Sequence, residues 1–334
     1  MSNNTCACKV PLKSKLLITG GSGFVGSALL DELVRSDKYY VVNALRKLTG
    51  MKTGNVEEFY LSTLSDMTNW LDALQNVDVV IHSAARVHVM NELESDPLQA
   101  FRAVNVDATM NLAKQAVEAK VRRFIFISSI KVNGEETSEG KPFTSWQRPE
   151  PLDDYGRSKL EAEQKLLALA QVSQMEVVII RPVLVYGPGV KANFEKMIAC
   201  VDKMIPLPLL SIANARSLVF IENLVDLICV CINHKNAANQ VFLVSDGVDY
   251  STVTIFQKLA KALHKHSMLF PFPVYIMKIA GLITGKKQVV QRLCGSLQVD
   301  ISRTKELLDW TPPVNTDEAF IKTVEHYKKY LSKL

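Results

Sequence analysis

Three residues in the middle of the chain have the types and spacing needed to transfer a proton to or from a substrate oxygen. Tyr155 and Lys159 lie four positions apart in a helical stretch and therefore share one face. An ammonium close to a phenol favours the phenolate, which brings the tyrosine nearer the pH at which it exchanges a proton. Ser129 ends a strand-like apolar run, where its hydroxyl could bond to the same oxygen. Because Tyr-x-x-x-Lys alone is common by chance, the serine makes the pattern informative.

A glycine-rich turn near the start of the chain has the spacing that binds phosphate. Gly21, Gly23 and Gly26 form a G-x-G-x-x-G pattern between an apolar run over 15–20 and a helical stretch over 24–35. Glycines let the backbone approach a pyrophosphate, and free amides at the start of the helix supply donors and partial positive charge. A tight turn without a ligand is the alternative. The position between strand and helix favours a dinucleotide site.

The end of the second strand-like run indicates which dinucleotide binds. In such folds an acidic residue about 20 positions after the glycines binds the ribose hydroxyls, whereas an arginine there accommodates a 2′-phosphate. Arg46, followed by Lys47, stands about 20 positions after Gly26 with no acidic residue nearby. A solvated arginine at the end of a strand is the alternative. We therefore expect NADP as the cofactor, with NAD as the second option.

The elements around these residues alternate between strand and helix. Such alternation predicts an α/β fold, namely a Rossmann-type doubly wound parallel sheet. The expected strands are Lys15–Gly20, Tyr39–Leu45, Val77–His82, Phe124–Ser128, Val177–Arg181 and Val241–Val244.

The pattern becomes irregular after Pro182 and then returns to a strand, which predicts a smaller C-terminal substrate lobe interleaved with the sheet. We expect a flexible tail over 1–14 and a dinucleotide-binding domain over 15–185 plus about 218–246. The substrate lobe is expected over about 186–217 plus 247–334.

The composition is that of a globular protein with a sizeable core. Hydrophobic residues make up 48% of the 334 residues and charged residues 22%, and the net charge is +5 with no long run of one sign. This charge is too weak to indicate nucleic acid, although it suits an anionic small ligand. The most apolar later stretch, Met268–Gly285, is interrupted by prolines and a lysine and is too short for a membrane span. We expect it to form a core or lid helix, with membrane contact as the less favoured alternative.

The cysteines and histidines do not form a metal site. Six cysteines lack the spacing of a disulfide framework or a zinc site, which favours reduced thiols and a cytoplasmic location. Cys6 and Cys8 have no matching cluster and are expected in an unstructured tail. His82 and His88 flank an expected strand, and we assign packing rather than chemistry to both.

Five motifs in order, TGGSGFVG, VIHSAA, SSIKVNG, YGRSK and RPVLVYGPG, resemble those of the extended short-chain dehydrogenase/reductases. The resemblance covers nearly the whole chain. It implies that Ser129, Tyr155 and Lys159 form the catalytic triad, and that Asn105 is the helix asparagine that holds the sheet together. The implied cofactor contacts are Gly20, Gly21, Gly23, Phe24, Val25, Gly26, Ala84 and Ala85, with Tyr155 and Lys159.

Four further segments, SSIKVNGE, YGPGVKANF, RSLVFIENLVD and RLCGSLQVD, resemble the UDP-glucose 4-epimerase group and its relatives that handle UDP-N-acetylhexosamines in surface-polysaccharide synthesis. This resemblance implies a UDP-sugar substrate. Arg216 and Arg292 are expected to clamp the diphosphate, because guanidinium pairs well with phosphate oxygens. Asn193 and Phe194 are expected to line the sugar cleft. A surface or packing role is the alternative for each of these four.

The sequence departs from the family pattern in places that affect function. Sugar-nucleotide dehydratases of the family carry Asp-Glu directly after the catalytic hydroxyl residue, where this chain has Ile130 and Lys131, so dehydration is disfavoured. The tyrosine usual before the glycine of that segment is Asn133. The acidic residue expected to contact adenine after the third strand is replaced by Thr63.

The resulting hypothesis is an NAD(P)-dependent enzyme that acts at C4 of a UDP-hexose or UDP-N-acetylhexosamine. Arg46 favours a 4-ketoreductase of a UDP-4-keto-6-deoxy sugar, and a UDP-glucose or UDP-N-acetylglucosamine 4-epimerase is the alternative. A non-catalytic dinucleotide-binding sensor or scaffold is the alternative from another class. We expect no nucleic-acid partner and no membrane span, and a homodimer is left open.

Overall fold

The structure is a computed structural model that describes residues 13–50, 54–87, 96–138 and 140–332. Cys6, Cys8 and His88 lie outside these ranges, as does almost all of the expected tail. No helix among the described residues has both the length and the apolar character needed to cross a bilayer.

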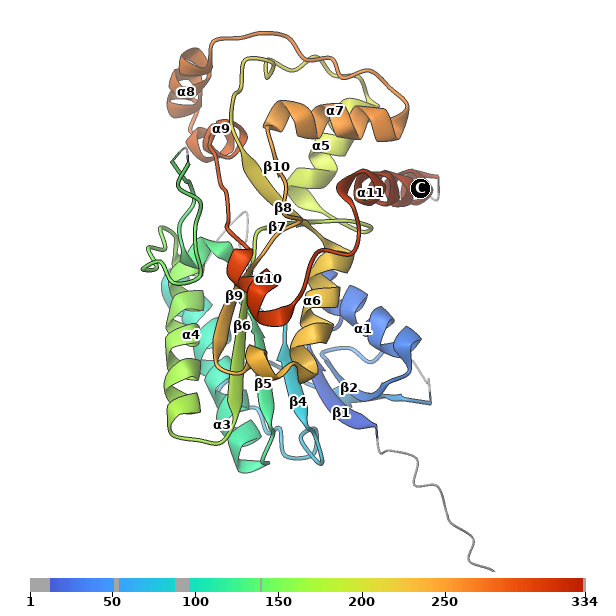
Figure 1. Ribbon diagram of the computed structural model, residues 1–334, viewed down its shortest axis with the longest axis vertical. Coiled ribbons are helices and arrows are strands. Elements are labelled where there is room, and N and C mark those ends of the chain that lie inside the picture. The colour runs from blue at the N-terminus through green and yellow to red at the C-terminus, as the bar shows by residue number, and fades with distance from the viewer. Residues whose placement is uncertain (1–12, 51–53, 88–95, 139, 333–334) are drawn as a thin grey trace, which may run out of the picture.

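Seven parallel strands form the central sheet of the described residues, in the order β3-β2-β1-β4-β5-β6-β9 (Figure 1). The order reverses between β1 and β4, and in such sheets the crevice at the carboxyl ends of these two strands binds the ligand. This arrangement confirms the predicted Rossmann-type fold. The strands are β1 (Ser14–Thr19), β2 (Tyr39–Leu45), β3 (Val56–Tyr60), β4 (Val79–His82), β5 (Arg123–Ile127), β6 (Glu176–Pro182) and β9 (Gln240–Val244).

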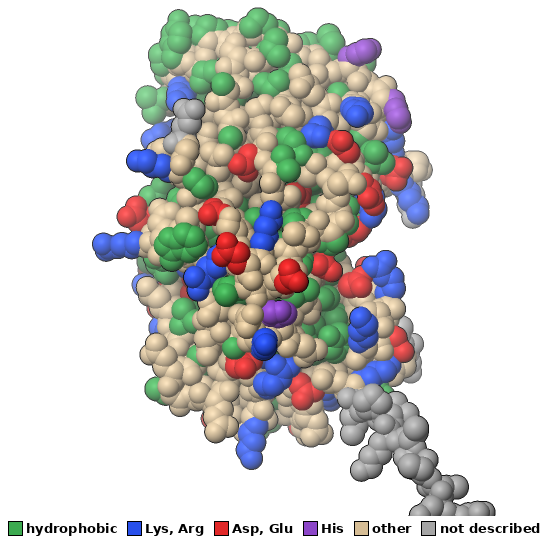
Figure 2. Space-filling model, in the orientation of Figure 1, with side chains coloured by type: hydrophobic (Ala, Val, Ile, Leu, Met, Phe, Trp, Pro, Cys, Tyr) green, Lys and Arg blue, Asp and Glu red, His purple; other side chains and the backbone are tan. Residues whose placement is uncertain are grey.

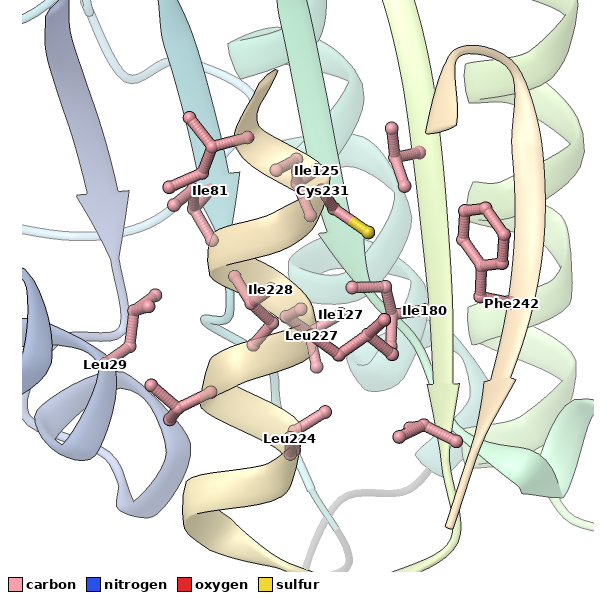
Figure 3. Close-up of a cluster of buried hydrophobic side chains, with 14 of the residues drawn as sticks. Leu29, Ile81, Ile125, Ile127, Ile180, Leu224, Leu227, Ile228, Cys231 and Phe242 are labelled. Atoms are coloured by element: carbon pink, nitrogen blue, oxygen red, sulfur yellow. The ribbon is translucent and has the colours of Figure 1, made fainter. Parts of the chain in front are cut away.

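Helices cover both faces of the sheet because successive strand residues point to opposite faces and nearly all of them are apolar. Leu16 and Ile18 belong to the core layer that also contains residues of α1 (Phe24–Ser36) and α6 (Ile221–Asn233). Figure 3 shows part of this layer, with Ile81, Ile125 and Ile127 of the sheet beside α6. Leu17 lies in the opposite core layer. That layer is covered by α3 (Ala108–Glu118) and α4 (Asp154–Gln171), with the short α2 (Pro97–Arg102) beside them.

Strand β3 is the one strand of the main sheet that the apolar runs did not reveal, although the family pattern that points to Thr63 implies a strand before it. Its sequence, Val-Glu-Glu-Phe-Tyr, carries adjacent charges and only Val56 is buried. An edge strand can keep such polar residues because one of its sides has no partner strand. The apolar pattern used to find the other strands is therefore weak here.

The second lobe contains a small sheet of β7 (Leu184–Tyr186), β8 (Arg216–Phe220) and β10 (Asp249–Tyr250). Residues 184–185 of β7 and 218–220 of β8 were expected within the dinucleotide-binding domain, yet they pair with each other in this separate sheet. Both strands turn away from the main sheet, and Phe220 lies in the core of the lobe. The helices of this part are α5 (Ala192–Asp202), α7 (Thr252–Leu263) and α11 (Thr316–Leu331), whereas α10 (Ser302–Leu308) packs against β9 of the main sheet.

Two short helices, α8 (Val274–Ile283) and α9 (Lys287–Cys294), form a hairpin at one end of the lobe (Figure 1). We call them the α8–α9 hairpin. Gly281 is the single buried residue of α8, and a Cβ there would lie 2.6 Å from Val290 Cγ2, so the two helices approach closely at this point. The stretch expected to form a core or lid helix thus does contain a helix, but that helix is not part of the buried core.

Candidate active site

The glycine turn lies between β1 and α1 and leaves no room for side chains. Gly20 has φ +77°, and a Cβ on it would lie 2.6 Å from the Ala84 backbone nitrogen. A Cβ on Gly26 would lie 2.1 Å from the Gly20 carbonyl oxygen. Gly23 occupies the N-cap position of α1 without any side-chain hydrogen bond, so the amides of the first turn remain available to a ligand. The predicted glycines, with Phe24 and Val25 as the first helical residues, thus form a cradle suited to an anion.

Strand β2, which lies beside this cradle, also has features that fit a dinucleotide. Asn43 in β2 is 3% exposed, and its Oδ1 has no hydrogen-bond partner. A Cβ on Gly21 would lie 2.1 Å from that oxygen, so this orphaned acceptor lies directly against the glycine turn. Arg46 is exposed just beyond the end of β2, where a 2′-phosphate could reach it. Thr63, which replaces the expected acidic residue, is exposed as well.

Residues after β4 connect the cradle to the catalytic helix. Ala84 and Ala85 are partly exposed directly after this strand. Asn105 lies in a π-helical turn, Ala103–Asp107, and its Nδ2 donates to the Arg86 carbonyl at 3.0 Å and to Ser158 Oγ at 3.0 Å. Its Oδ1 accepts from the Arg86 amide at 2.8 Å. Asn105 therefore ties the loop after β4 to α4.

The three predicted catalytic residues come together at the carboxyl end of β5. Ser129 follows β5 and caps a short 3₁₀ helix, Ile130–Val132, and its hydroxyl acts on Tyr155 by lowering the pKa of the phenol. Tyr155 lies in the first turn of α4, where the Asp153 carboxylate accepts from the Gly156 amide at 2.7 Å. Lys159 lies one turn further along and donates from Nζ to the Ile127 carbonyl at 2.8 Å.

Burial dominates the electrostatics of this group. It raises the pKa of Tyr155 well above 10, the Asp153 charge raises it further, and the Ser129 hydroxyl opposes both. Burial also lowers the pKa of Lys159 to about 7, against the opposing effect of Glu163. The sequence analysis expected a lysine ammonium to favour the phenolate. In the structure burial outweighs any such effect, because it raises the pKa of Tyr155, and Lys159 Nζ donates to the Ile127 carbonyl.

A charged cluster beside Tyr155 was not found from the sequence. Lys131 forms ion pairs with Asp153 and, at 3.1 Å, with Glu135. Lys131 thus partly neutralises the carboxylate that raises the pKa of Tyr155. The i,i+4 spacing of Lys131 and Glu135 was a local signal, whereas the contact with Asp153 depends on tertiary structure.

A second polar network holds the catalytic helix against β6. Arg181 and Glu163 form a buried bidentate ion pair, with Nε 3.0 Å from Oε1, and their side chains are 4% and 2% exposed. Arg181 Nη1 also donates to Asn133 Oδ1 at 2.9 Å. Asn133, which replaces the tyrosine usual in the family, donates to the Thr144 carbonyl at 3.0 Å. It therefore serves to hold the segment that follows Ser129.

His82 has a packing role, as predicted. The side chain is fully buried, and its ring stacks on Phe126. Its Nδ1 is hydrogen-bonded to Thr19 Oγ1 at 2.7 Å, and its Nε2 is hydrogen-bonded to Thr109 Oγ1 at 2.9 Å. Burial and the charge of Lys159 lower its pKa to about 3, so the ring is neutral.

The four residues predicted to contact the substrate differ in their surroundings. Arg216 Nη1 donates to the Gly295 carbonyl at 2.8 Å, and burial together with the Arg292 charge lowers its pKa while Glu136 raises it. The charges of both Arg292 and Glu136 therefore act at Arg216. Asn193 is exposed at the start of α5.

Phe194 does not lie in an open cleft. Its side chain is 1% exposed and stacks on Tyr186 in the core of the lobe, against Phe320. The expected contact of this side chain with the sugar is therefore corrected to a packing role. An apolar residue beside a motif cannot be placed in a core or a cleft from sequence alone.

Comparisons with known proteins agree with this geometry. Residues 16–245 match the NAD dependent epimerase/dehydratase family. The chain is 50% identical over 323 residues to a UDP-glucose 4-epimerase of Vibrio cholerae, covering 96% of this chain and 98% of the relative.

Two solved structures share the fold. The UDP-glucuronic acid 4-epimerase of Bacillus cereus, in complex with NAD, has a TM-score of 0.76 at 21% identity and covers 95% of this chain and 99% of its own. The UDP-glucose 4-epimerase of Thermotoga maritima, with UDP-glucose, has a TM-score of 0.74 at 21% identity with the same coverage. The chain therefore belongs to the NAD dependent epimerase/dehydratase family and is an NAD-dependent enzyme.

Proposed function

We propose that this enzyme oxidises and reduces C4 of a UDP-hexose or UDP-N-acetylhexosamine and acts as a 4-epimerase. The observation that carries the proposal is the meeting of Ser129, Tyr155 and Lys159 at the carboxyl end of β5, next to the glycine cradle. The extensive identity to a relative named UDP-glucose 4-epimerase supports this choice of substrate class and reaction.

The side chains have distinct roles in this reaction. A nicotinamide cofactor, when bound in the cradle, supplies the acceptor and donor of the C4 hydride. An epimerase oxidises its sugar first, so Tyr155 must enter the cycle as a phenolate, which takes the proton of the C4 hydroxyl as the hydride leaves C4. The phenol so formed, which is the form that burial favours, returns the proton to the C4 carbonyl oxygen when the sugar is reduced. Ser129 orients the same oxygen, and Lys159 holds the ribose of the cofactor and stabilises the phenolate.

The nucleotide end of the substrate is assigned to the second lobe. The charge of Arg292 lowers the pKa of Arg216, whereas the Glu136 carboxylate raises it, so two cations and one carboxylate act at this place. A diphosphate would add negative charge that pairs with both cations, and it suits the planar donors of guanidinium. We therefore assign both arginines to the UDP diphosphate.

A 4-ketoreductase is the second candidate, and Arg46 is the observation that favours it. An exposed arginine at the end of β2, with no acidic residue on the strand end, suits the 2′-phosphate of NADP. A reductase must exchange its cofactor in every cycle, and cells keep the NADP pool reduced. An epimerase retains its cofactor and removes and returns the same hydride.

The two reactions are distinguished by their products. Purified protein is incubated with UDP-glucose, UDP-N-acetylglucosamine and a UDP-4-keto-6-deoxy-N-acetylhexosamine, with and without NADPH, and the products are followed by NMR. We expect interconversion of C4 epimers without net consumption of cofactor. Stoichiometric oxidation of NADPH with the keto sugar alone would overturn the epimerase in favour of the reductase.

A further inference from the structure

The α8–α9 hairpin presents an apolar face to solvent that the proposed chemistry does not use. Its exposed side chains on α8 are Tyr275 at 67%, Ile276 at 37%, Ile279 at 53%, Leu282 at 67% and Ile283 at 79%. At 100° per residue these positions all fall on one side of the helix. Most exposed apolar residues of soluble proteins are scattered singly, so five on one helix face indicate an interaction surface.

The face is held outward by the way that the hairpin packs. The close approach of Gly281 to Val290 joins the two helices on the opposite side of α8, and Val274 and Met277 pack against the core of the lobe. Figure 2 shows hydrophobic side chains gathered at the end of the molecule that carries α8 in Figure 1, with no acidic side chain among them. The apolar face therefore projects from a packed support.

The charge along this part of the chain has one sign. From residue 251 to residue 299 the sequence contains no aspartate or glutamate, whereas it contains seven lysines and arginines. Lys278, Lys286 and Lys287 are exposed in the hairpin, and none of them has an ion pair among the described residues. The lysines within the hairpin are thus available to an anionic surface.

We propose that the α8–α9 hairpin docks on the surface of an anionic lipid bilayer, with the apolar face of α8 at the boundary of the acyl chains and the lysines at the headgroups. An interfacial helix combines an apolar face with flanking Lys or Arg and lies in the plane of the membrane. With ten residues α8 is about 15 Å long, which suits this position and not a span. Tyr275 supplies the aromatic ring with a polar tip that favours the interface.

A second copy of the chain is a poorer occupant of the same face. A two-fold contact places the same patch on both partners. Lys278, Lys286 and Lys287 would then approach their own copies, and like charges disfavour that arrangement. An anionic bilayer satisfies both the apolar residues and the lysines.

Docking would place the nucleotide end of the active site near the membrane. Arg292 lies on α9, and its charge acts on Arg216. The apolar face of α8 and the assigned diphosphate site therefore belong to neighbouring parts of one lobe. The enzyme could then exchange its substrate or product close to the bilayer, although the docking itself does not depend on the proposed reaction.

Vesicle co-sedimentation of the full chain tests the proposal. Vesicles of phosphatidylcholine alone are compared with vesicles that also contain phosphatidylglycerol, at low and at high salt. We expect the protein to bind the anionic vesicles, and we expect binding to weaken with salt because the ions screen the lysines. Absence of binding to the anionic vesicles at low salt overturns the proposal.

Two pairs of variants show whether the hairpin is the docking surface. Ile279→Ser/Leu282→Ser should lower partitioning at least tenfold, whereas Met67→Ser/Val172→Ser, at positions 86% and 84% exposed elsewhere, should leave it unchanged. Lys286→Glu/Lys287→Glu should lower it by about 25-fold or more at low salt, and Lys38→Glu/Lys235→Glu should have a smaller effect. Equal effects of hairpin and control variants overturn the assignment.

Two further measurements separate the membrane from other occupants. A Tyr275→Trp chain should show added quenching of fluorescence by brominated lipids relative to the unchanged chain, which places this residue at the acyl boundary. Analytical ultracentrifugation without lipid should show the same oligomeric state for the unchanged chain and for Ile279→Ser/Leu282→Ser. A dimer that is lost in that variant, or a Trp that is not quenched, overturns the membrane in favour of a protein contact.

Discussion

The part of the molecule that carries the catalytic residues, formed by Ser129, α4 and β6, is built in the opposite way to the α8–α9 hairpin. We call this part the wall. In the wall, charged groups such as Glu163 and Arg181 are buried and each is paired, so the backbone around Tyr155 is fixed by many directed bonds. In the hairpin, apolar side chains are exposed and the lysines have no ion pair among the described residues. The difference indicates that the wall is organised by contacts within the chain, and that the hairpin is suited to contacts outside it.

The buried ion pair beside the catalytic helix should show the largest effect of a single substitution on stability. Glu163→Gln leaves the Arg181 charge buried without its partner and should lower the free energy of unfolding by about 3–5 kcal/mol. The same substitution at Glu318, in an exposed pair with Lys322, should cost less than about 1 kcal/mol. Urea denaturation of both variants at neutral pH measures these values. Equal losses would show that the pair does not hold the wall.

Loss of the phenol should have the next largest effect. Tyr155→Phe removes the proton-transfer group and should lower turnover about 10²-fold or more while cofactor binding stays nearly unchanged. Tyr186→Phe removes a buried phenol that bonds to Asp246 at 2.9 Å in the second lobe, so it should affect stability and spare turnover. Steady-state kinetics and cofactor titration check both. A Tyr155→Phe enzyme that keeps more than roughly a tenth of its activity would exclude this tyrosine as the acid.

The pH dependence of stability tests the burial of Lys159. Its pKa falls from the ordinary 10.5 to about 7 in the folded protein, so between these values the unfolded chain binds a proton that the folded chain does not. Stability contributed by this group therefore rises with pH from about 7 to 10.5, by up to about 1.4 kcal/mol per pH unit, and is lost as the pH falls to 7.

Comparison with substituted chains isolates this contribution. The unfolding free energy of the unchanged protein minus that of Lys159→Met, measured without ligand, should become more positive as the pH rises across that window. Lys165→Met, on the same helix with a side chain that is 47% exposed, should give a difference that does not change with pH. A flat difference for Lys159→Met would show that its amine stays charged in the folded state.

The nucleotide specificity should respond more weakly, because Arg46 is exposed. If Arg46 binds a 2′-phosphate, Arg46→Asp should weaken NADP binding about tenfold and spare or improve NAD binding. Lys47→Asp makes a similar change of charge one position further and controls for a general loss of positive potential. Titration of both cofactors measures the preference. An unchanged preference in Arg46→Asp removes the basis for NADP and for the reductase.

The sequence predicted the features that local pattern determines. Apolar runs placed the buried strands, and the glycine spacing and Tyr-x-x-x-Lys located the cradle and the triad. The apolar runs did not reveal strand β3 because its edge position permits charges, and Phe194 was misplaced because spacing does not distinguish a core from a cleft.

Contacts between distant parts of the chain could not be predicted in the same way. Lys131 meets Asp153 across 22 positions, and Arg181 meets Asn133 across 48, so only the tertiary structure brings them together. The lowered pKa of Lys159 likewise depends on how the surrounding elements bury it, which residue types alone do not reveal.

The smallest expected effect concerns the hairpin itself. Leu282→Ala should change the free energy of unfolding by no more than about 0.5 kcal/mol, because the side chain is 67% exposed and alanine favours a helix slightly more than leucine does. Leu227→Ala makes the same change in α6 at a position with no exposed surface and should cost about 2–5 kcal/mol. Urea denaturation without lipid compares the two. A loss above about 1 kcal/mol for Leu282→Ala would mean that this side chain is covered within the protein, and the contrast between a self-contained wall and an outward-facing hairpin would then be wrong.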